Sequence, residues 1–398
     1  MTTYSAVVTT GIYCRPGCGA RPRAENVRTF ELAARAEAAG FRACLRCRPY
    51  RAAGPVAPGA PELVCRAVQL IIEGVLDTGT EAALGERLAV SPRHLRRIFT
   101  GQLGITPDQL ARSRRAHFAR RLLDDTDLTI ADVAFASGFT SLRQFNRQMR
   151  EVFSAPPRDL RDRRRRADRL AADGGLTIRL PFEPPFDWDA TAAFFARTAV
   201  PGVESVSDGV YRRTISLDGD PGMLEVRPGG SDHLLLRVHL PYWEGLIHVA
   251  ARAGRMTGTD ASPAVRAPGA WGACEAAVQA VVAQECASPG EARAQLGRIT
   301  ERLGPRVPGL THGLTRLFPS AEVLAGGDLA SLGLPPATAA PLAALADGVA
   351  GGRIPLGHSA GHAELMTALT AVSGIRPATA GLIALRLGHQ TPYPALKS

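Results

Sequence analysis

The 398-residue chain is long enough for two to four domains that each bury a core, with 45% apolar and 21% charged residues. No run of about 18 apolar residues occurs, so no transmembrane helix is predicted. The first eight residues lack the basic and then apolar pattern of a signal peptide. We therefore expect a cytoplasmic protein with no membrane partner.

The net charge of +10 is carried mainly by arginine and is unevenly placed. Most of the arginine clusters lie between Arg93 and Arg169, and they include the uninterrupted run from Arg163 to Arg166. This excess indicates either a polyanionic partner or an arginine-rich solvated surface, and charge alone does not favour one over the other.

Composition breaks predict four domains. An Ala/Gly/Pro-rich linker is expected at residues 51–60, and a basic stretch ending in a second linker at 156–175. A weaker break lies at 263–268. The predicted domains are residues 1–52, 60–166, 175–262 and 263–398.

The apolar periodicity changes between these segments. Three- and four-residue spacing predicts helices in residues 61–160 and 268–388, whereas alternation with Gly, Asp and Pro turns predicts strands in 176–248. In the first segment, which is dense in cysteine and arginine, one helical stretch is predicted over residues 29–39.

Four of the seven cysteines form two close pairs in the first segment, Cys14-x3-Cys18 and Cys44-x2-Cys47. Two pairs separated by about 25 residues have the spacing of a four-cysteine zinc site, in which each pair occupies a tight turn. In the reducing cytoplasm such pairs bind metal more often than they form disulfides. The spacing alone favours a purely structural zinc that holds a small domain together.

The sequence around these cysteines adds a second reading. Residues 9–18 (TTGIYCRPGC) and 40–49 (GFRACLRCRP) closely resemble the metal-binding domain of Ada-type adaptive-response proteins. The resemblance implies that Cys14 accepts a methyl group from a methylphosphotriester in DNA, and that one Zn²⁺ is held by Cys14, Cys18, Cys44 and Cys47. It also implies phosphate contacts from Thr10, Arg21 and Arg46.

The chemistry of a four-cysteine zinc site is compatible with this role. Zinc keeps its thiols deprotonated, and a zinc-bound thiolate remains nucleophilic toward a methyl carbon. Methylation converts one thiolate into a thioether and removes one negative charge, so repulsion of DNA phosphates falls and DNA affinity rises. The methylation is irreversible, which predicts a single-turnover methyltransferase that also acts as a sensor.

Two helix-turn-helix patterns follow in residues 81–100 and 129–150, joined by a long helix over about 108–123. Ser91 and Pro92 are expected to start the second helix of the first motif. In the second motif Gly138 marks the turn and Ser141 begins the next helix. The arrangement, with the closing residues 153–158 (FSAPPR), resembles the AraC/XylS family.

This resemblance implies double-stranded DNA and RNA polymerase as partners, with no small-molecule cofactor. Phe145 and Met149 are expected to face the core, which leaves the polar side of each recognition helix for DNA. The predicted DNA-contacting residues are Arg93, His94, Arg96, Arg97, Arg143, Gln144, Asn146 and Arg147. The alternative is that these side chains form solvated helix faces.

The C-terminal half resembles the 3-methyladenine DNA glycosylase II (AlkA-type) family. The resemblance is carried by residues 179–204, 212–228, 267–284 and 369–388. It implies an α+β lobe followed by a helix-hairpin-helix lobe, in a family that flips a damaged base into an aromatic pocket and uses an aspartate to cleave the glycosidic bond.

The sequence departs from that family's catalytic pattern. In the predicted hairpin, Ala378 occupies the position of the pocket tryptophan, and Arg376 replaces a glycine that helps to bind phosphate. Glu285 stands at the wedge position, and no Asp follows Asp347, although the family's aspartate is expected near Ser398. We therefore predict a degenerate, truncated glycosylase region. Other carboxylates there, such as Glu275, are expected at the surface or in helix caps.

Taken together, the predicted fold class is a multidomain α+β protein. It comprises a small zinc domain, an all-α AraC-type double helix-turn-helix domain, an AlkA-like α+β lobe and a helix-hairpin-helix helical lobe. The predicted function is a DNA alkylation sensor and transcription regulator that activates alkylation-response genes. The alternatives are an active alkylated-base (3-methyladenine) DNA glycosylase with regulatory N-terminal domains, and a regulator with only a structural zinc.

Overall fold

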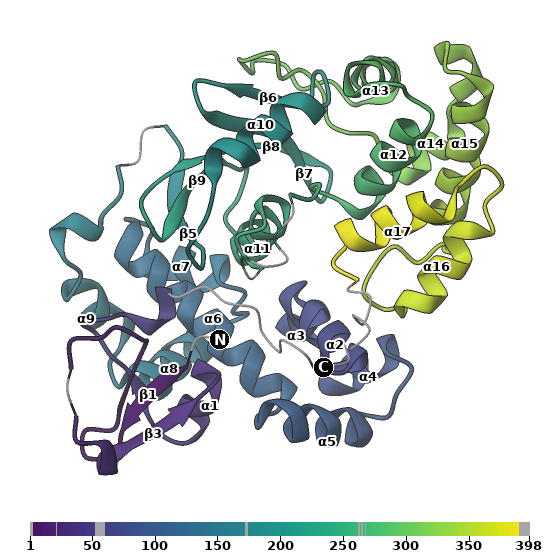
Figure 1. The fold of residues 1–398 in the computed structure, drawn as a ribbon. Coiled ribbons are helices and arrows are strands. Elements are labelled where there is room, and N and C mark those ends of the chain that lie inside the picture. The colour runs from purple at the N-terminus through teal and green to yellow at the C-terminus, as the bar shows by residue number, and fades with distance from the viewer. Residues whose placement is uncertain are drawn as a thin grey trace.

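The computed structural model describes residues 3–20, 22–51, 60–171, 174–261, 263, 266 and 268–389. In chain order, a small sheet domain is followed by a helical domain, an antiparallel sheet lobe and a helical lobe (Figure 1). This confirms the predicted fold class. Among the described residues, no helix has the length and apolar character needed to cross a membrane.

The first domain is a four-stranded sheet in the order β3-β1-β2-β4, in which only β2 and β4 are parallel. Its elements are β1 (Tyr4–Val7), β2 (Ile12–Cys14), β3 (Val27–Phe30), α1 (Ala33–Ala38) and β4 (Arg42–Ala43). The helix predicted over residues 29–39 is therefore wrong at its start. Thr29 and Phe30 pair with β1 instead, because β-branched and aromatic side chains fit a strand and the alanines after them favour a helix.

The second domain contains both predicted helix-turn-helix units. Its helices are α2 (Glu62–Ile72), α3 (Val75–Thr78), α4 (Glu81–Arg87), α5 (Pro92–Leu103), α6 (Pro107–Asp125), α7 (Ile130–Ala136), α8 (Leu142–Phe153) and α9 (Pro157–Asp162). The predicted helix starts are confirmed: the hydroxyls of Ser91 and Ser141 accept hydrogen bonds from the N–H groups of His94 and Gln144. Gly138 adopts the positive φ, +80°, that the second turn requires.

The third region is a five-stranded antiparallel sheet in the order β5-β9-β8-β7-β6, with α10 packed on β6 and β7. Its elements are β5 (Leu176–Pro181), α10 (Trp188–Thr198), β6 (Glu204–Ser207), β7 (Val210–Leu217), β8 (Asp220–Pro228), β9 (His233–His239) and α11 (Leu246–Thr257). The alternating pattern of the sequence thus predicted strands correctly.

The helical lobe follows. It contains α12 (Ala273–Gln284), α13 (Pro289–Leu303), α14 (Ala321–Gly326), α15 (Pro336–Ala350), α16 (His362–Thr370) and α17 (Pro377–Arg386). The surface or capping role expected for Glu275 is wrong. This residue is 4% exposed and holds the buried Arg213 of β7 in a two-point ion pair, with N–O distances of 3.1 and 2.7 Å. A buried carboxylate requires such a partner, and β7 lies too far away in sequence for periodicity to reveal it.

One hydrophobic core extends across three of these regions. Tyr13 from the first sheet, Leu122 from α6, Phe145 from α8 and Leu236 from β9 belong to the same buried cluster. The helical lobe has a separate cluster, and the first helix-turn-helix unit has a third. Helix α6 packs against both α1 and β5, so it joins the N-terminal sheet to the third region.

Candidate metal centre and nucleic-acid interface

The four predicted cysteines converge at one end of the N-terminal sheet. The sulfurs of Cys14, Cys18, Cys44 and Cys47 all lie within 4.8 Å of one another. Tetrahedral Zn–S bonds of about 2.3 Å place neighbouring sulfurs about 3.8 Å apart, so this donor set fits Zn²⁺ closely. Among the described residues, this is the one group of three or more His, Cys, Asp or Glu residues close enough to hold a metal. The predicted zinc cofactor is confirmed.

The strands and turns explain why these sulfurs meet. Cys14 ends β2, and the following turn returns the chain to Cys18, whose N–H donates to the carbonyl of Arg15. Cys44 follows β4, which lies beside β2, and its N–H donates to the carbonyl of Tyr13. Parallel pairing of two strands thus places both cysteine turns at the same edge.

The surroundings of the sulfurs differ in a way that matters for reactivity. Burial raises the pKa of Cys14, and the neighbouring sulfurs of Cys47 and Cys44 raise it further. Burial likewise raises the pKa of Cys47, to about 12, against a hydrogen bond from the N–H of Arg15. At Cys44 the N–H groups of Cys47 and Arg46 outweigh burial and lower its pKa. Crowded thiolates of this kind require a cation to stay ionised together.

The metal end is tied to the helix-turn-helix domain through the residue before Cys14. The fully buried Tyr13 donates a hydrogen bond to Oε1 of Glu37, at 2.6 Å, and the same oxygen lies 2.5 Å from Nε2 of His117 on α6. Burial opposes ionisation of Glu37, but His117 outweighs it and lowers the pKa of that carboxyl. The strand that carries Cys14 is therefore anchored to the long helix of the next domain.

The predicted phosphate-contacting residues flank this site. Thr10 is exposed in the turn before β2, with its hydroxyl 3.4 Å from the carbonyl of Val7. Arg46 is also exposed, and its guanidinium lies against Gly19, where a Cβ would stand only 3.2 Å from Nη2. Arg21 lies outside the described residues. The phosphate contacts themselves stay predictions.

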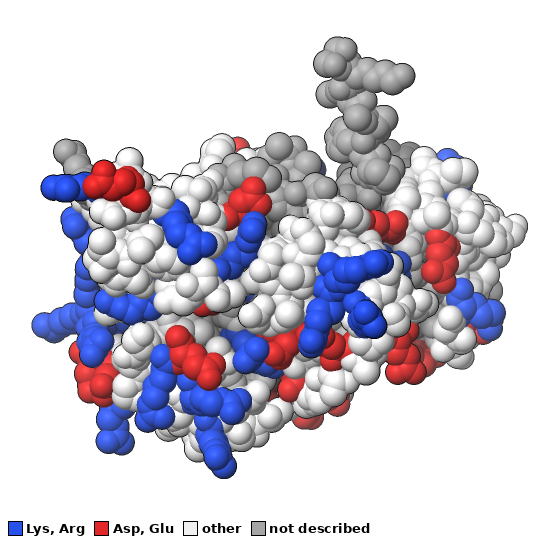
Figure 2. Space-filling view, turned by 90° about the horizontal axis from the view of Figure 1, so that it is seen from below, with Lys and Arg blue, Asp and Glu red and all other residues white. Residues whose placement is uncertain are grey.

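The recognition helices carry their polar residues outward, as predicted, while Phe145 and Met149 are fully buried. Exposed are Arg93, Arg96, Arg97, Arg143 and Arg147, and half-buried are His94, Gln144 and Asn146. Several of these already have partners within the chain, among them Arg97 and His94, which lie 3.2 Å apart. Arg96 forms a 2.8 Å ion pair with Glu81, and the amide of Asn146 donates to the carbonyl of Leu142. Seen from below, basic side chains are dense over the left and centre of the molecule (Figure 2).

The predicted hairpin of the helical lobe is present between α16 and α17. Gly374 has φ +89° and lies against Pro341, so a side chain at this position would clash. Gln284 clamps the hairpin by donating to the carbonyl of Gly374 at 2.6 Å, and Arg376 forms a 3.2 Å ion pair with Glu285. Ala378 is exposed at the predicted tryptophan position.

Sequence reasoning missed a buried ion network where four segments meet. Arg48 and Arg51, just after the last cysteine, pair with Asp124 of α6, and Asp125 pairs with Arg179 of β5. Asp168, close to the arginine run, pairs with Arg48 at 2.5 Å. The acidic pair Asp124-Asp125 within an otherwise arginine-rich helix was the sequence signal for this network.

A four-cysteine metal domain, a double helix-turn-helix domain and a glycosylase-like region together define a DNA-binding regulator combined with a repair module. Residues 2–50 match the family model of the metal binding domain of Ada, 84–163 that of a helix-turn-helix domain, and 177–268 that of the AlkA N-terminal domain.

Similarity to individual proteins extends over the whole arrangement. The chain is 36% identical, over 98% of its length, to the Mycobacterium tuberculosis protein named "Probable bifunctional transcriptional activator/DNA repair enzyme AlkA", of which it covers 84%. The chain belongs to this family of bifunctional transcriptional activators and DNA repair enzymes. It is also 33% identical to the Escherichia coli bifunctional transcriptional activator/DNA repair enzyme Ada, across 39% of this chain and 43% of that protein. It is 29% identical to E. coli DNA-3-methyladenine glycosylase 2, across 52% of this chain and 79% of that protein.

Proposed function

We propose that the chain senses DNA alkylation by irreversibly transferring the methyl group of a DNA methylphosphotriester to Cys14. The observation that carries this proposal is the difference between the sulfurs. Cys44 and Cys47 accept backbone N–H hydrogen bonds, which stabilise the anion and reduce its nucleophilicity. The main influences on Cys14 are its burial and the other sulfurs, so its thiolate is less stabilised than those of Cys44 and Cys47.

Zn²⁺ bound by the four cysteines keeps their thiols ionised at neutral pH. The lone pair of Cys14 Sγ forms the new S–CH₃ bond while the C–O bond of the phosphotriester breaks, and the phosphodiester leaves with the electron pair. No proton is transferred. Cys14 is 6% exposed, so the methyl group must reach a sulfur that lies just below the surface. Thr10, Arg21 and Arg46 orient the phosphate.

The switch follows from charge. Methylation removes one negative charge from the end of the protein that faces DNA phosphates, and affinity for DNA rises as repulsion falls. Helices α5 and α8 then read the promoter of alkylation-response genes, and RNA polymerase is recruited. The names of the relatives, which describe transcriptional activators, support this second part.

For the C-terminal half we propose a supporting role without glycosylase activity. Arg376 and Glu285 neutralise each other at the hairpin, and Ala378 offers no aromatic wall for a flipped base. The full chain is expected to form no abasic sites in duplex DNA containing 3-methyladenine. Abasic sites above the spontaneous level would instead establish the alternative, an active alkylated-base glycosylase.

Intact-mass spectrometry tests the main proposal. The zinc-loaded chain, incubated with a duplex carrying one methylphosphotriester, should gain about 14 Da, and peptide mapping should place the gain on Cys14. Cys286→Ser, on the far lobe, is the control and should gain the same mass. No gain despite full zinc occupancy would leave only a structural zinc, and a gain on another cysteine would reject the assignment of Cys14.

A further inference from the structure

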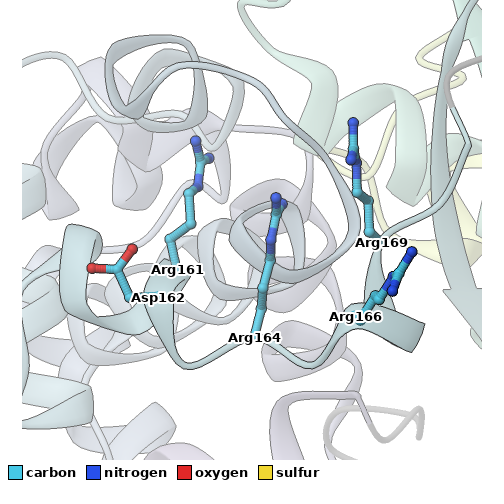
Figure 3. A pocket seen from close by; sticks show the side chains of 5 residues that line it. All are labelled: Arg161, Asp162, Arg164, Arg166 and Arg169. Carbon is cyan, nitrogen blue, oxygen red and sulfur yellow. The ribbon is translucent and has the colours of Figure 1, made fainter.

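A basic pocket lies at the C-terminal end of α9, where the helix-turn-helix domain ends. It has a volume of about 440 Å³ and is lined by Arg161, Asp162, Arg164, Arg166 and Arg169. Arg161, Arg164 and Arg169 extend to the same side of the ribbon, while Asp162 turns away from them (Figure 3). We call this site the Arg161 pocket. It contains part of the arginine run, for which neither recognition helix accounts.

The positive charge of the Arg161 pocket is only partly compensated. Asp127 pairs with Arg164 at 2.7 Å and with Arg169 at 2.5 Å, so one carboxylate serves two guanidinium groups. Asp162 is exposed and forms none of the ion pairs found within the described chain. Four arginines therefore face two carboxylates, and the pocket retains an excess of positive charge.

Arg161 contributes hydrogen-bond donors that the described chain does not satisfy. Its Nε and Nη2 atoms are buried and have no hydrogen-bond partner within the described part of the chain. Buried donors are nearly always satisfied, and an unpaired guanidinium donor costs more than a neutral one. Burial and the nearby Arg164 also lower the pKa of Arg161. An anion in the pocket would satisfy the donors and restore the preference for the charged form.

The location of the pocket favours one class of anion. Asp127, which holds two of the pocket arginines, lies two residues before Thr129, the N-cap of α7. Helix α7 is the first helix of the second helix-turn-helix unit, and in this motif the first helix crosses the DNA backbone while the second enters the major groove. Arg164 is also bonded to the carbonyl of Thr126, so the pocket is fixed to the same turn.

We propose that the Arg161 pocket binds a phosphate group of the DNA backbone, next to the bases faced by α8. Planar guanidinium groups suit this ligand because each can donate two parallel hydrogen bonds to phosphate oxygens. The contact adds affinity and fixes the register of the second helix-turn-helix unit without reading sequence. The inference rests on the proposed DNA-binding function, but it does not depend on methyl transfer to Cys14.

The salt dependence of DNA binding tests the proposal. The full zinc-loaded chain is titrated with a mixed-sequence duplex that spans both helix-turn-helix units, at several salt concentrations. Each lost phosphate contact lowers the slope of log affinity against log salt by about 0.9. Arg161→Gln and Arg166→Ala should each lower the slope by about this amount and weaken binding several-fold. Arg302→Ala, an exposed change on α13, should leave the slope unchanged.

The variants are interpretable only while they remain folded, so zinc content and thermal unfolding are measured alongside. Arg166→Ala serves as the safer variant because Arg166 is exposed. Unchanged slopes in both variants would overturn the proposal. A second titration uses inorganic phosphate alone. If phosphate binds to the wild type but not to Arg161→Gln, while the DNA slopes stay equal, the pocket takes a free anion and the assignment to DNA is wrong.

Methyl transfer separates this proposal from the broader one. The same variants are incubated with the methylphosphotriester duplex, and their intact masses are measured by mass spectrometry. A reduced salt slope with no mass gain at Cys14 in any protein would reject the sensor function and retain the Arg161 pocket. A normal mass gain with unchanged salt slopes would reject the pocket and retain the sensor.

Discussion

The four-cysteine cluster and the hairpin of the helical lobe differ in how their polar groups are satisfied. At the metal end, four sulfurs meet within 4.8 Å with no cation of their own, so the cluster needs an external ion. At the hairpin, Gln284 bonds Gly374 and Arg376 pairs with Glu285, so the polar groups satisfy one another. The four cysteines therefore need a bound cation to balance their charge, whereas the polar groups of the hairpin need no ligand.

Metal removal should have the largest effect on stability, and it should affect the two clusters differently. Chelation of zinc should unfold the N-terminal sheet domain, because structural zinc contributes on the order of 10 kcal/mol or more at pH 7. Hydrogen exchange would show loss of protection in β1 to β4, while α12 to α17 keep theirs. Cys44→Ser should reproduce the loss and Cys286→Ser should not. Retained protection after complete zinc removal would contradict the assignment.

The buried pair Arg213–Glu275 provides the next largest effect. Glu275→Ala removes the two-point partner of the buried Arg213, which keeps a 3.3 Å contact with Glu204, and should cost about 3 kcal/mol of unfolding free energy. Chemical denaturation measures this directly. Glu322→Ala, an exposed change on α14, should stay within about 0.5 kcal/mol of the wild type. Equal midpoints for the two variants would show that the pair is not a support of the interface between β7 and α12.

A smaller loss is expected where the metal domain joins α6. Glu37→Ala removes the acceptor shared by Tyr13 and His117 and should destabilise the chain by about 1–3 kcal/mol. Zinc content should be unchanged, since the four ligands remain. The exposed Glu31→Ala is the matched control. If Glu37→Ala instead released zinc, the bridge would be part of the metal site itself.

The effect that is smallest at neutral pH concerns protonation. His389 stacks on His358 at 5.3 Å between ring centres, and burial with the charge of His358 lowers the pKa of His389 from 6.5 to about 4. The unfolded chain therefore binds a proton at a higher pH than the folded chain, and stability falls as the pH drops from 6.5 toward 4. His389→Phe, which retains a ring, should flatten this dependence in urea midpoints. An equally steep profile in that variant would place the effect elsewhere.

The sequence predicted the local features of the metal site and of the helix-turn-helix units well. The cysteine spacing defined the ligands, and Ser91 and Ser141 marked the recognition helices because N-caps act within four residues. Long-range charge pairing could not be predicted in the same way. Glu37 and His117 are 80 residues apart, and Arg213 and Glu275 are 62 apart, so only the tertiary fold brings them together.

The continuous core through α6 has a geometric consequence. Tyr13 and Phe145 belong to one buried cluster, and Arg51 binds both Asp124 and Asp125, so packing and ion pairs connect the strand that carries Cys14 to the domain that contains α8. The separation between Cys14 and α8 is then set by the fold. If α8 enters the major groove as proposed, this connection would limit Cys14 to phosphates at one distance along the duplex. On the proposed function, a methylphosphotriester at any other distance would then react in a separate binding event, before α8 binds the promoter.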